Sequence, residues 1–202
     1  EEAAELFDRK MEENLQRQKE PFESAGVETE NKLEQEKFTV RLLLGGQRTL
    51  STAPYQRDFI WNSELVVSLF HDTIVSTNAA WGGFVLVKKE EGHYEVIDGV
   101  QRIYAILIIL SSVRDYLDEN GYADIACSVH SLVLSNHFDG PRFVPHERHR
   151  RYFEHSIHKY PNSDFANTEN TSEENISKCY DVIMEELSLL DPGVVKNKVE
   201  EF

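Results

Sequence analysis

The chain has 202 residues, 40% of them hydrophobic and 28% charged, which suffices for the core of one sizeable domain and excludes global disorder. Acidic residues outnumber Lys and Arg by 36 to 21, so the net charge of −15 excludes a protein that grips nucleic acid through bulk positive charge. Two distant cysteines, Cys127 and Cys179, exclude a disulfide framework and a zinc knuckle. No apolar run reaches the ~18–20 residues of a membrane span and no signal-peptide pattern is present, so we expect a fragment of a soluble cytoplasmic protein.

The N-terminal segment is polar, and we expect it to be an appendage to the domain. Residues 1–20 carry a thin apolar stripe at helical spacing, which favours a helix that packs on another surface. Residues 21–37 are typical of a linker. Residues 37–44 then predict a strand, and residues 49–53 resume extended structure after a Gly45-Gly46 turn.

The middle of the chain predicts a helix, a hairpin and a second helix in that order. The first helix begins at Asn62 or Ser63, both of which are favourable caps. Apolar runs at 81–88 and 93–97 flank a glycine-containing loop, the pattern of a β-hairpin. Residues 103–117 are apolar almost all round, which is typical of a buried helix.

The C-terminal part predicts one strand and two helices. Residues 123–134 alternate loosely between apolar and polar and predict a strand, whereas residues 146–160 predict a basic helix. A capping box at 171–174 opens a long amphipathic helix that Asp191-Pro192-Gly193 ends. Both cysteines fall on apolar faces of these elements and are expected in the core.

These patterns predict an α+β fold, a small mixed sheet with packed helices. We divide the chain into an N-terminal helix and linker (1–37), a core with the sheet (38–135) and a helical extension (136–202), which we expect to continue into a further C-terminal region.

A candidate anion site follows the predicted hairpin, where a strand, an Asp98-Gly99 turn and a buried helix succeed one another. The start of a helix presents unpaired N–H groups and the positive end of the dipole. Gly99 lets a phosphate approach the backbone, and Arg102 can fork onto its oxygens. Asp98 can hold Mg²⁺ or a sugar hydroxyl, and Gln101 can orient a water or a base. The alternative is a plain strand–turn–helix with Asp98 as the cap.

A second candidate stretch, Pro54–Trp61, concentrates aromatic residues around one arginine just before a helix. Arg57 can reach the same anion from across a pocket, with Tyr55 stacking on a base. Phe59 and Trp61 are expected to be core anchors. The alternative for Arg57 is an ion pair with a nearby carboxylate.

The segment 138–160 is the basic part of this acidic chain, with five Lys and Arg, three acids and four histidines. Its arginines can contact DNA phosphates or complete a nucleotide pocket, and the candidates are Arg142, Arg148, Arg150 and Arg151. The alternative is a solvated helix face. The pair His146 and His149 misses the HExxH spacing of a zinc site by one residue, so its imidazoles are not expected to align over a metal, and His155 and His158 are expected to be surface imidazoles.

Three stretches together resemble the N-terminal domain of GmrSD-type restriction enzymes: Tyr55-Gln56-Arg57 with Trp61, Gly83–Leu86, and Ile97–Arg102. The resemblance runs from about Phe38 to Leu190. It implies a fold similar to ParB and sulfiredoxin, and a nucleotide-dependent role in bacterial defence against modified phage DNA. It further implies control of a nuclease of the His-Asn-His type in another domain or subunit.

The resemblance also implies a ligand, a nucleoside triphosphate (GTP or another) with Mg²⁺. It assigns nucleotide contacts to the residues that match the two motifs: Tyr55, Gln56, Arg57, Asp98, Gly99, Gln101 and Arg102. Asp98 and Gln101 are then the candidates for catalysis of NTP hydrolysis, and Asp98 the candidate metal ligand.

The sequence departs from the family motif in ways that favour binding over hydrolysis. Val100 replaces the first glutamine, and Ile103-Tyr104-Ala105 stands where many members have a hydrophobic residue and two threonines. Positioning of the attacking water governs the rate, whereas phosphate contacts mainly set affinity. Two other readings stay open, a non-enzymatic module that recognises modified DNA and a nuclease in its own right; a homo-oligomer also stays open.

Overall fold

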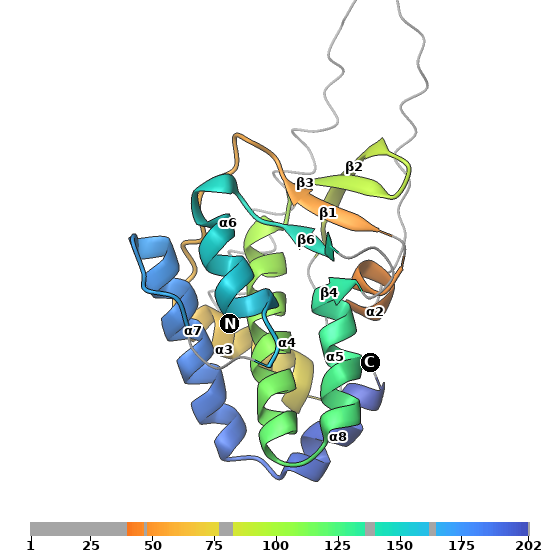
Figure 1. Ribbon diagram of the computed structural model, residues 1–202, viewed down its shortest axis with the longest axis vertical. Coiled ribbons are helices and arrows are strands. Elements are labelled where there is room, and N and C mark those ends of the chain that lie inside the picture. Colours follow the sequence, from red (N-terminus) through yellow and green to blue (C-terminus); the bar gives the residue numbers. More distant parts are fainter. Residues whose placement is uncertain (1–39, 47, 77–82, 136–139, 162–164, 202) are drawn as a thin grey trace, which may run out of the picture. The chain divides into compact units, whose positions relative to one another are not determined.

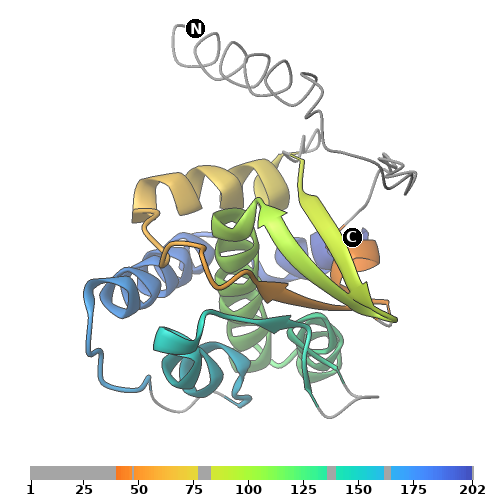
Figure 2. The same cartoon turned by 90° about the horizontal axis from the view of Figure 1, so that it is seen from above.

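The computed structural model describes residues 40–46, 48–76, 83–135, 140–161 and 165–201, and within them it confirms the α+β class. A four-stranded mixed sheet lies on one side of the helices, as Figures 1 and 2 show. Its strands stand in the order β2 (Val85–Glu90), β3 (His93–Asp98), β1 (Thr49–Thr52) and β6 (Phe143–Val144). The predicted appendage, residues 1–37, lies outside the described residues.

The sheet combines a hairpin with two parallel pairings. Strands β2 and β3 are antiparallel, as the sequence predicts, while β1 runs parallel to both β3 and β6. Leu50, Val96 and Phe143 come from three different strands and are fully buried in the core. A separate two-stranded ladder joins β4 (Leu134–Ser135) to β5 (Gly140–Pro141).

Helix α4 (Val100–Glu119) is the centre of the fold and confirms the prediction of a buried helix. Every residue from Ile103 to Leu117 is buried. Around it pack α3 (Ser63–Phe70), α5 (Ala123–Val133), α7 (Thr171–Ser188) and α8 (Pro192–Glu201), visible on all sides of α4 in Figure 1. Because α4 begins directly after β3, the sheet and the helical core meet at the residues between them.

Two predicted strands are helices instead. Residues 37–44 contain the short helix α2 (Val40–Leu44), which buries Val40, Leu43 and Leu44 at helical spacing and ends at Gly45. Residues 123–134 form α5, which turns a helical stripe toward α4. The stripe consists of Ala126, Val129, Leu132 and Val133. Cys127 lies on the opposite side of α5 and is exposed, which corrects the expectation of a core residue, whereas Cys179 is buried as expected.

The remaining predicted helices are confirmed with small changes at their ends. Asn62 caps α3 by accepting the N–H of Leu65 at 3.1 Å. The basic helix is α6 (Glu147–Phe153), continued by the π-helix η2 (Glu154–His158). Asn170 caps α7 one residue before the predicted box, and the Glu173 carboxylate accepts the N–H of Glu169 at 2.5 Å.

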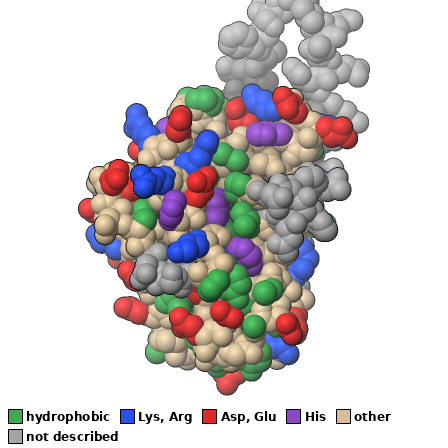
Figure 3. Space-filling view, viewed as in Figure 1, with side chains coloured by type: hydrophobic (Ala, Val, Ile, Leu, Met, Phe, Trp, Pro, Cys, Tyr) green, Lys and Arg blue, Asp and Glu red, His purple; other side chains and the backbone are tan. Residues whose placement is uncertain are grey.

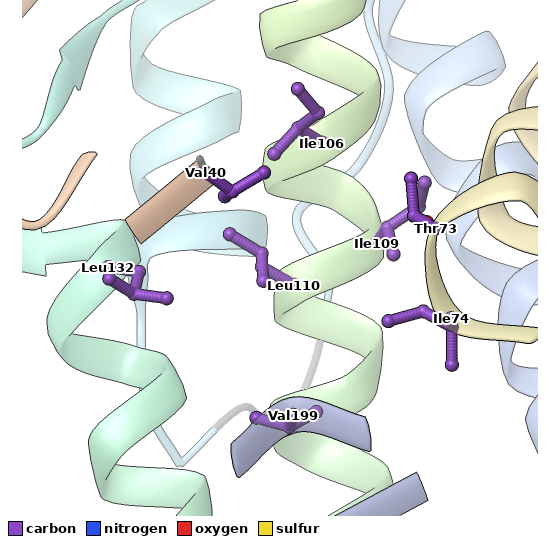
Figure 4. A pocket seen from close by; sticks show the side chains of 8 residues that line it. All are labelled: Val40, Thr73, Ile74, Ile106, Ile109, Leu110, Leu132 and Val199. Atoms are coloured by element: carbon purple, nitrogen blue, oxygen red, sulfur yellow. The ribbon is translucent and has the colours of Figure 1, made fainter. Parts of the chain in front are cut away.

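A small apolar cavity of about 20 Å³ lies where α4 meets α2, α5, α8 and the π-helix η1 (His71–Val75). Figure 4 shows the side chains that converge on it: Val40, Thr73, Ile74, Ile106, Ile109, Leu110, Leu132 and Val199. An almost wholly apolar space of this size is too small for any ligand larger than one water. Among the described helices, none is long and apolar enough to span a membrane.

Candidate functional site

The turn between β3 and α4 is shaped by a left-handed glycine. Gly99 has a φ of +94° and is the cap residue of α4, with no side chain capping the helix. Asp98 therefore ends the strand without capping the helix, in contrast to the plain strand–turn–helix alternative. The N–H groups of the first turn are left for another partner because an α-helix supplies none within itself. The turn thus has the free donors that an anion requires.

The ring of Phe84 packs against this turn and constrains which residue can stand at position 99. A Cβ on Gly99 would lie 2.4 Å from Cδ1 of Phe84, so any other residue there would displace the Phe84 ring. The guanidinium of Arg102 stands 5.7 Å from the centroid of the same ring. Arg102 also donates a hydrogen bond to the carbonyl of Gly83. Phe84 therefore supports both the glycine turn and one of the two arginines of the site.

The loop at 54–61 is tied to the turn by two glutamine side chains. Gln56 donates from Nε2 to the carbonyl of Ile97 at 2.7 Å. Gln101 accepts the N–H of Ile60 on Oε1 at 2.8 Å and donates from Nε2 to the carbonyl of Asp58 at 3.1 Å. The two motifs, more than forty residues apart, are thus bound to one another through main-chain atoms.

Between loop and turn lies a polar pocket of about 180 Å³. Its lining includes all the predicted nucleotide-contacting residues except Tyr55, which is 70% exposed. The pocket is lined by Gln56, Arg57, Trp61, Asp98, Gly99, Val100, Gln101 and Arg102. Trp61, expected only as a core anchor, is half-buried and forms part of the wall, while Phe59 is fully buried as expected.

The charges of the pocket suit an anion. Arg57 is exposed, and within the described part of the chain no carboxylate forms an ion pair with it. Arg102 is directed by a carbonyl and a ring, which leave its positive charge uncompensated. Asp98 is the one acidic residue of the lining and is exposed. Two arginines and a helix start therefore face one carboxylate.

Asp58, which the sequence does not single out, points toward α6. Its carboxylate lies 3.7 Å from the Arg148 guanidinium and 3.8 Å from Nδ1 of His149. His149 is fully buried, and burial lowers its pKa. Nε2 of His149 is 2.6 Å from the Tyr104 hydroxyl, which also accepts the N–H of His146. The loop is thus held on its second side by α6 and by the buried tyrosine of α4.

The four predicted DNA-contacting arginines do not form one group. Arg148, Arg150 and Arg151 are exposed on α6, where Figure 3 shows Lys, Arg and His side chains together with acidic ones. Arg142 is only 7% exposed and donates to the carbonyls of Ser131 and Gly46. Its burial removes Arg142 from the basic surface, because its guanidinium ties together the segments around α5 and α2.

The described residues contain no group of three His, Cys, Asp or Glu side chains that could hold a metal ion by itself. Asp98 is the one carboxylate at the pocket. Mg²⁺ is commonly held by one or two carboxylates together with substrate phosphates and waters. The residues present therefore fit a magnesium ion that arrives with a phosphate ligand.

Comparison with protein families matches residues 40–201 to the GmrSD restriction endonuclease, N-terminal domain. The match includes the whole sheet, the loop at 54–61 and the turn at 97–102. The curated proteins contain no match to the chain. A match over this length, with both motifs of the pocket inside it, shows that the chain belongs to the family of GmrSD restriction endonuclease N-terminal domains.

Proposed function

We propose that this GmrSD-type domain binds a nucleoside triphosphate in the pocket between the loop at 54–61 and the start of α4, and that it regulates restriction of modified DNA according to its nucleotide state. The observation that carries the proposal is that three groups able to bind an anion meet in one place. Arg57, Arg102 and the uncapped first turn of α4 share one pocket. Two guanidinium groups and helix N–H donors are complementary to a polyphosphate.

Further residues in and beside the pocket have a place in this proposal. Gly99 lets a phosphate approach the main chain, and Asp98 holds Mg²⁺ together with phosphate oxygens. Trp61 offers an apolar wall, and the exposed ring of Tyr55 lies one residue before Gln56, where it can close over a base. The proposal is one of binding, with hydrolysis as a further outcome to be measured, since Val100 stands in place of the first glutamine of the family motif.

The nuclease that such a domain controls is proposed to lie in another domain or subunit. The exposed arginines of α6 are the proposed DNA contacts: Arg148, Arg150 and Arg151. These three side chains are also the observation that favours the second candidate, a DNA-recognition module that needs no nucleotide. A steep salt dependence of DNA binding without any nucleotide binding would favour that second function.

The test is calorimetric titration with ATP, GTP, CTP and UTP, with and without Mg²⁺, with phosphate release assayed in the same samples. Arg57→Ala is expected to cost about 1.5–3 kcal/mol, roughly a ten- to hundredfold loss of affinity, because it removes a charge-assisted hydrogen bond. Arg41→Ala is the matched control, since Arg41 is an exposed arginine of α2 outside the pocket lining. Failure of all four nucleotides to bind would refute the proposal.

A further inference from the structure

We propose that Gln101 is a positioning residue: it holds the main chain of the loop so that Arg57 faces the pocket, and it does not act on the reacting atoms of a ligand. The inference rests on the proposed function, because it concerns how the same pocket contacts an anion. It replaces the role that the sequence suggests for Gln101, the orientation of a water or a base.

The first observation is that both ends of the Gln101 amide are committed to the main chain. Oε1 accepts the N–H of Ile60 at 2.8 Å, and Nε2 donates to the carbonyl of Asp58 at 3.1 Å. A strand residue in a parallel sheet binds its neighbour in this way, through the carbonyl before and the N–H after one residue. The side chain therefore acts as a short strand that fixes the loop on both sides of Phe59.

The second observation is that the loop is anchored on either side of Arg57. Gln56, the residue before it, binds the carbonyl of Ile97 at 2.7 Å. Phe59 is fully buried, with its ring centroid 5.6 Å from that of Tyr104. The Arg57 side chain itself is exposed and lines the pocket. Anchored neighbours and an exposed guanidinium are the arrangement of an arginine whose main chain is placed in advance of ligand binding.

The third observation concerns what Gln101 would lose by turning to a ligand. An amide has two N–H donors and two acceptor lone pairs, so the clamp leaves one of each. Orienting a water with both the carbonyl and the amino group would draw the side chain away from Asp58 and Ile60. The N–H of Ile60 would then need a new acceptor, and the loop would lose its tie to α4. A water held by both amide groups therefore competes with the main-chain clamp, whereas a water on the one remaining donor or lone pair does not.

A double-mutant cycle separates the two roles. Gln101→Met keeps the length of the side chain and removes both hydrogen bonds. We expect it to weaken nucleotide binding roughly 3- to 30-fold in the native background and to add almost nothing to Arg57→Ala, because coupled residues are not additive. An equal loss in both backgrounds would show that Gln101 contacts the ligand independently. Unchanged affinity with loss of phosphate release would show a catalytic residue. Either result overturns the inference.

Hydrogen exchange tests the clamp without any ligand. In Gln101→Met the amide proton of Ile60 is expected to exchange faster with solvent. The amide proton of Leu65, which is hydrogen-bonded to the Asn62 side chain, serves as the internal control. Unchanged exchange at Ile60 overturns the inference even if no nucleotide binds, so its failure is distinct from that of the proposed function. If the methionine variant does not fold, Gln101→Glu keeps the acceptor for Ile60 and loses the donor to Asp58, and the cycle is repeated with it.

Discussion

Replacing Gly99 by alanine tests whether the left-handed turn and its contact with Phe84 build the pocket. A φ of +94° costs an L-residue about 1–3 kcal/mol, and the stiffer unfolded chain returns about 0.4–1 kcal/mol. The new Cβ, 2.4 Å from Cδ1 of Phe84, must also push the ring about 1 Å aside, which costs a further ~1–3 kcal/mol as overpacking. We expect Gly99→Ala to lower the free energy of unfolding by about 1–5 kcal/mol, with a middle value of ~3 kcal/mol.

Gly121 supplies the matched control. It has a φ of +84°, close to that of Gly99, but a Cβ there would meet nothing within 4 Å. Gly121→Ala therefore carries the backbone strain without the steric contact, and we expect a loss of no more than ~2.5 kcal/mol. Both variants are measured by urea denaturation followed by circular dichroism.

The same substitution has an expected effect on binding. When the Phe84 ring moves, Arg102 loses its cation–π support, so Gly99→Ala should also weaken nucleotide binding about tenfold, whereas Gly121→Ala should leave it unchanged. Equal losses of stability in the two variants would refute the argument that Phe84 constrains Gly99. Native affinity in Gly99→Ala would refute the argument that the turn builds the pocket.

Two further predictions concern the buried charges around α4. Arg114→Met leaves the Asp115 carboxylate, only 6% exposed, without its counter-ion, and should cost about 3–5 kcal/mol in urea denaturation, a loss that adding Asp115→Leu should partly restore. Burial, with Arg114 and His130 nearby, lowers the pKa of His158 to about 4. The unfolded chain then binds more protons, so stability should fall by up to about 3 kcal/mol as pH drops from ~6.5 to 4, and His158→Phe should flatten that slope.

The elements that the sequence predicts correctly are those with one dominant pattern. Helix α4 is apolar almost all round and the hairpin has two apolar runs around a glycine loop, so neither has a competing interpretation. In α5 two patterns compete. Ile125, Cys127 and Val129 alternate as in a strand, while the buried stripe has helical spacing. Packing against α4 decides between them, and that packing is not visible in eleven residues taken alone.

The candidate site divides in the same manner. The Asp98-Gly99 turn and its arginine are consecutive in the sequence, so their proximity could be predicted. The contacts of Gln101 with the loop and of Asp58 with α6 join segments more than forty residues apart and depend on how the chain folds back. Arg142 gives no local signal of burial either, because its partners are the carbonyls of two other segments, one of them 96 residues away.

The pairing of β1 with β3 has a consequence for the order in which the protein acquires its site during synthesis. The loop at 54–61 emerges first, but its partners, the Ile97 carbonyl and the Gln101 side chain, follow about forty residues later, and β1 cannot join its parallel neighbour before then. Such non-local contacts form only after the intervening chain has closed on itself. A nascent chain therefore presents half a pocket until α4 has left the ribosome. A ligand that contacts both halves binds only the finished domain. Its binding raises the free energy of unfolding in proportion to the logarithm of the ligand concentration.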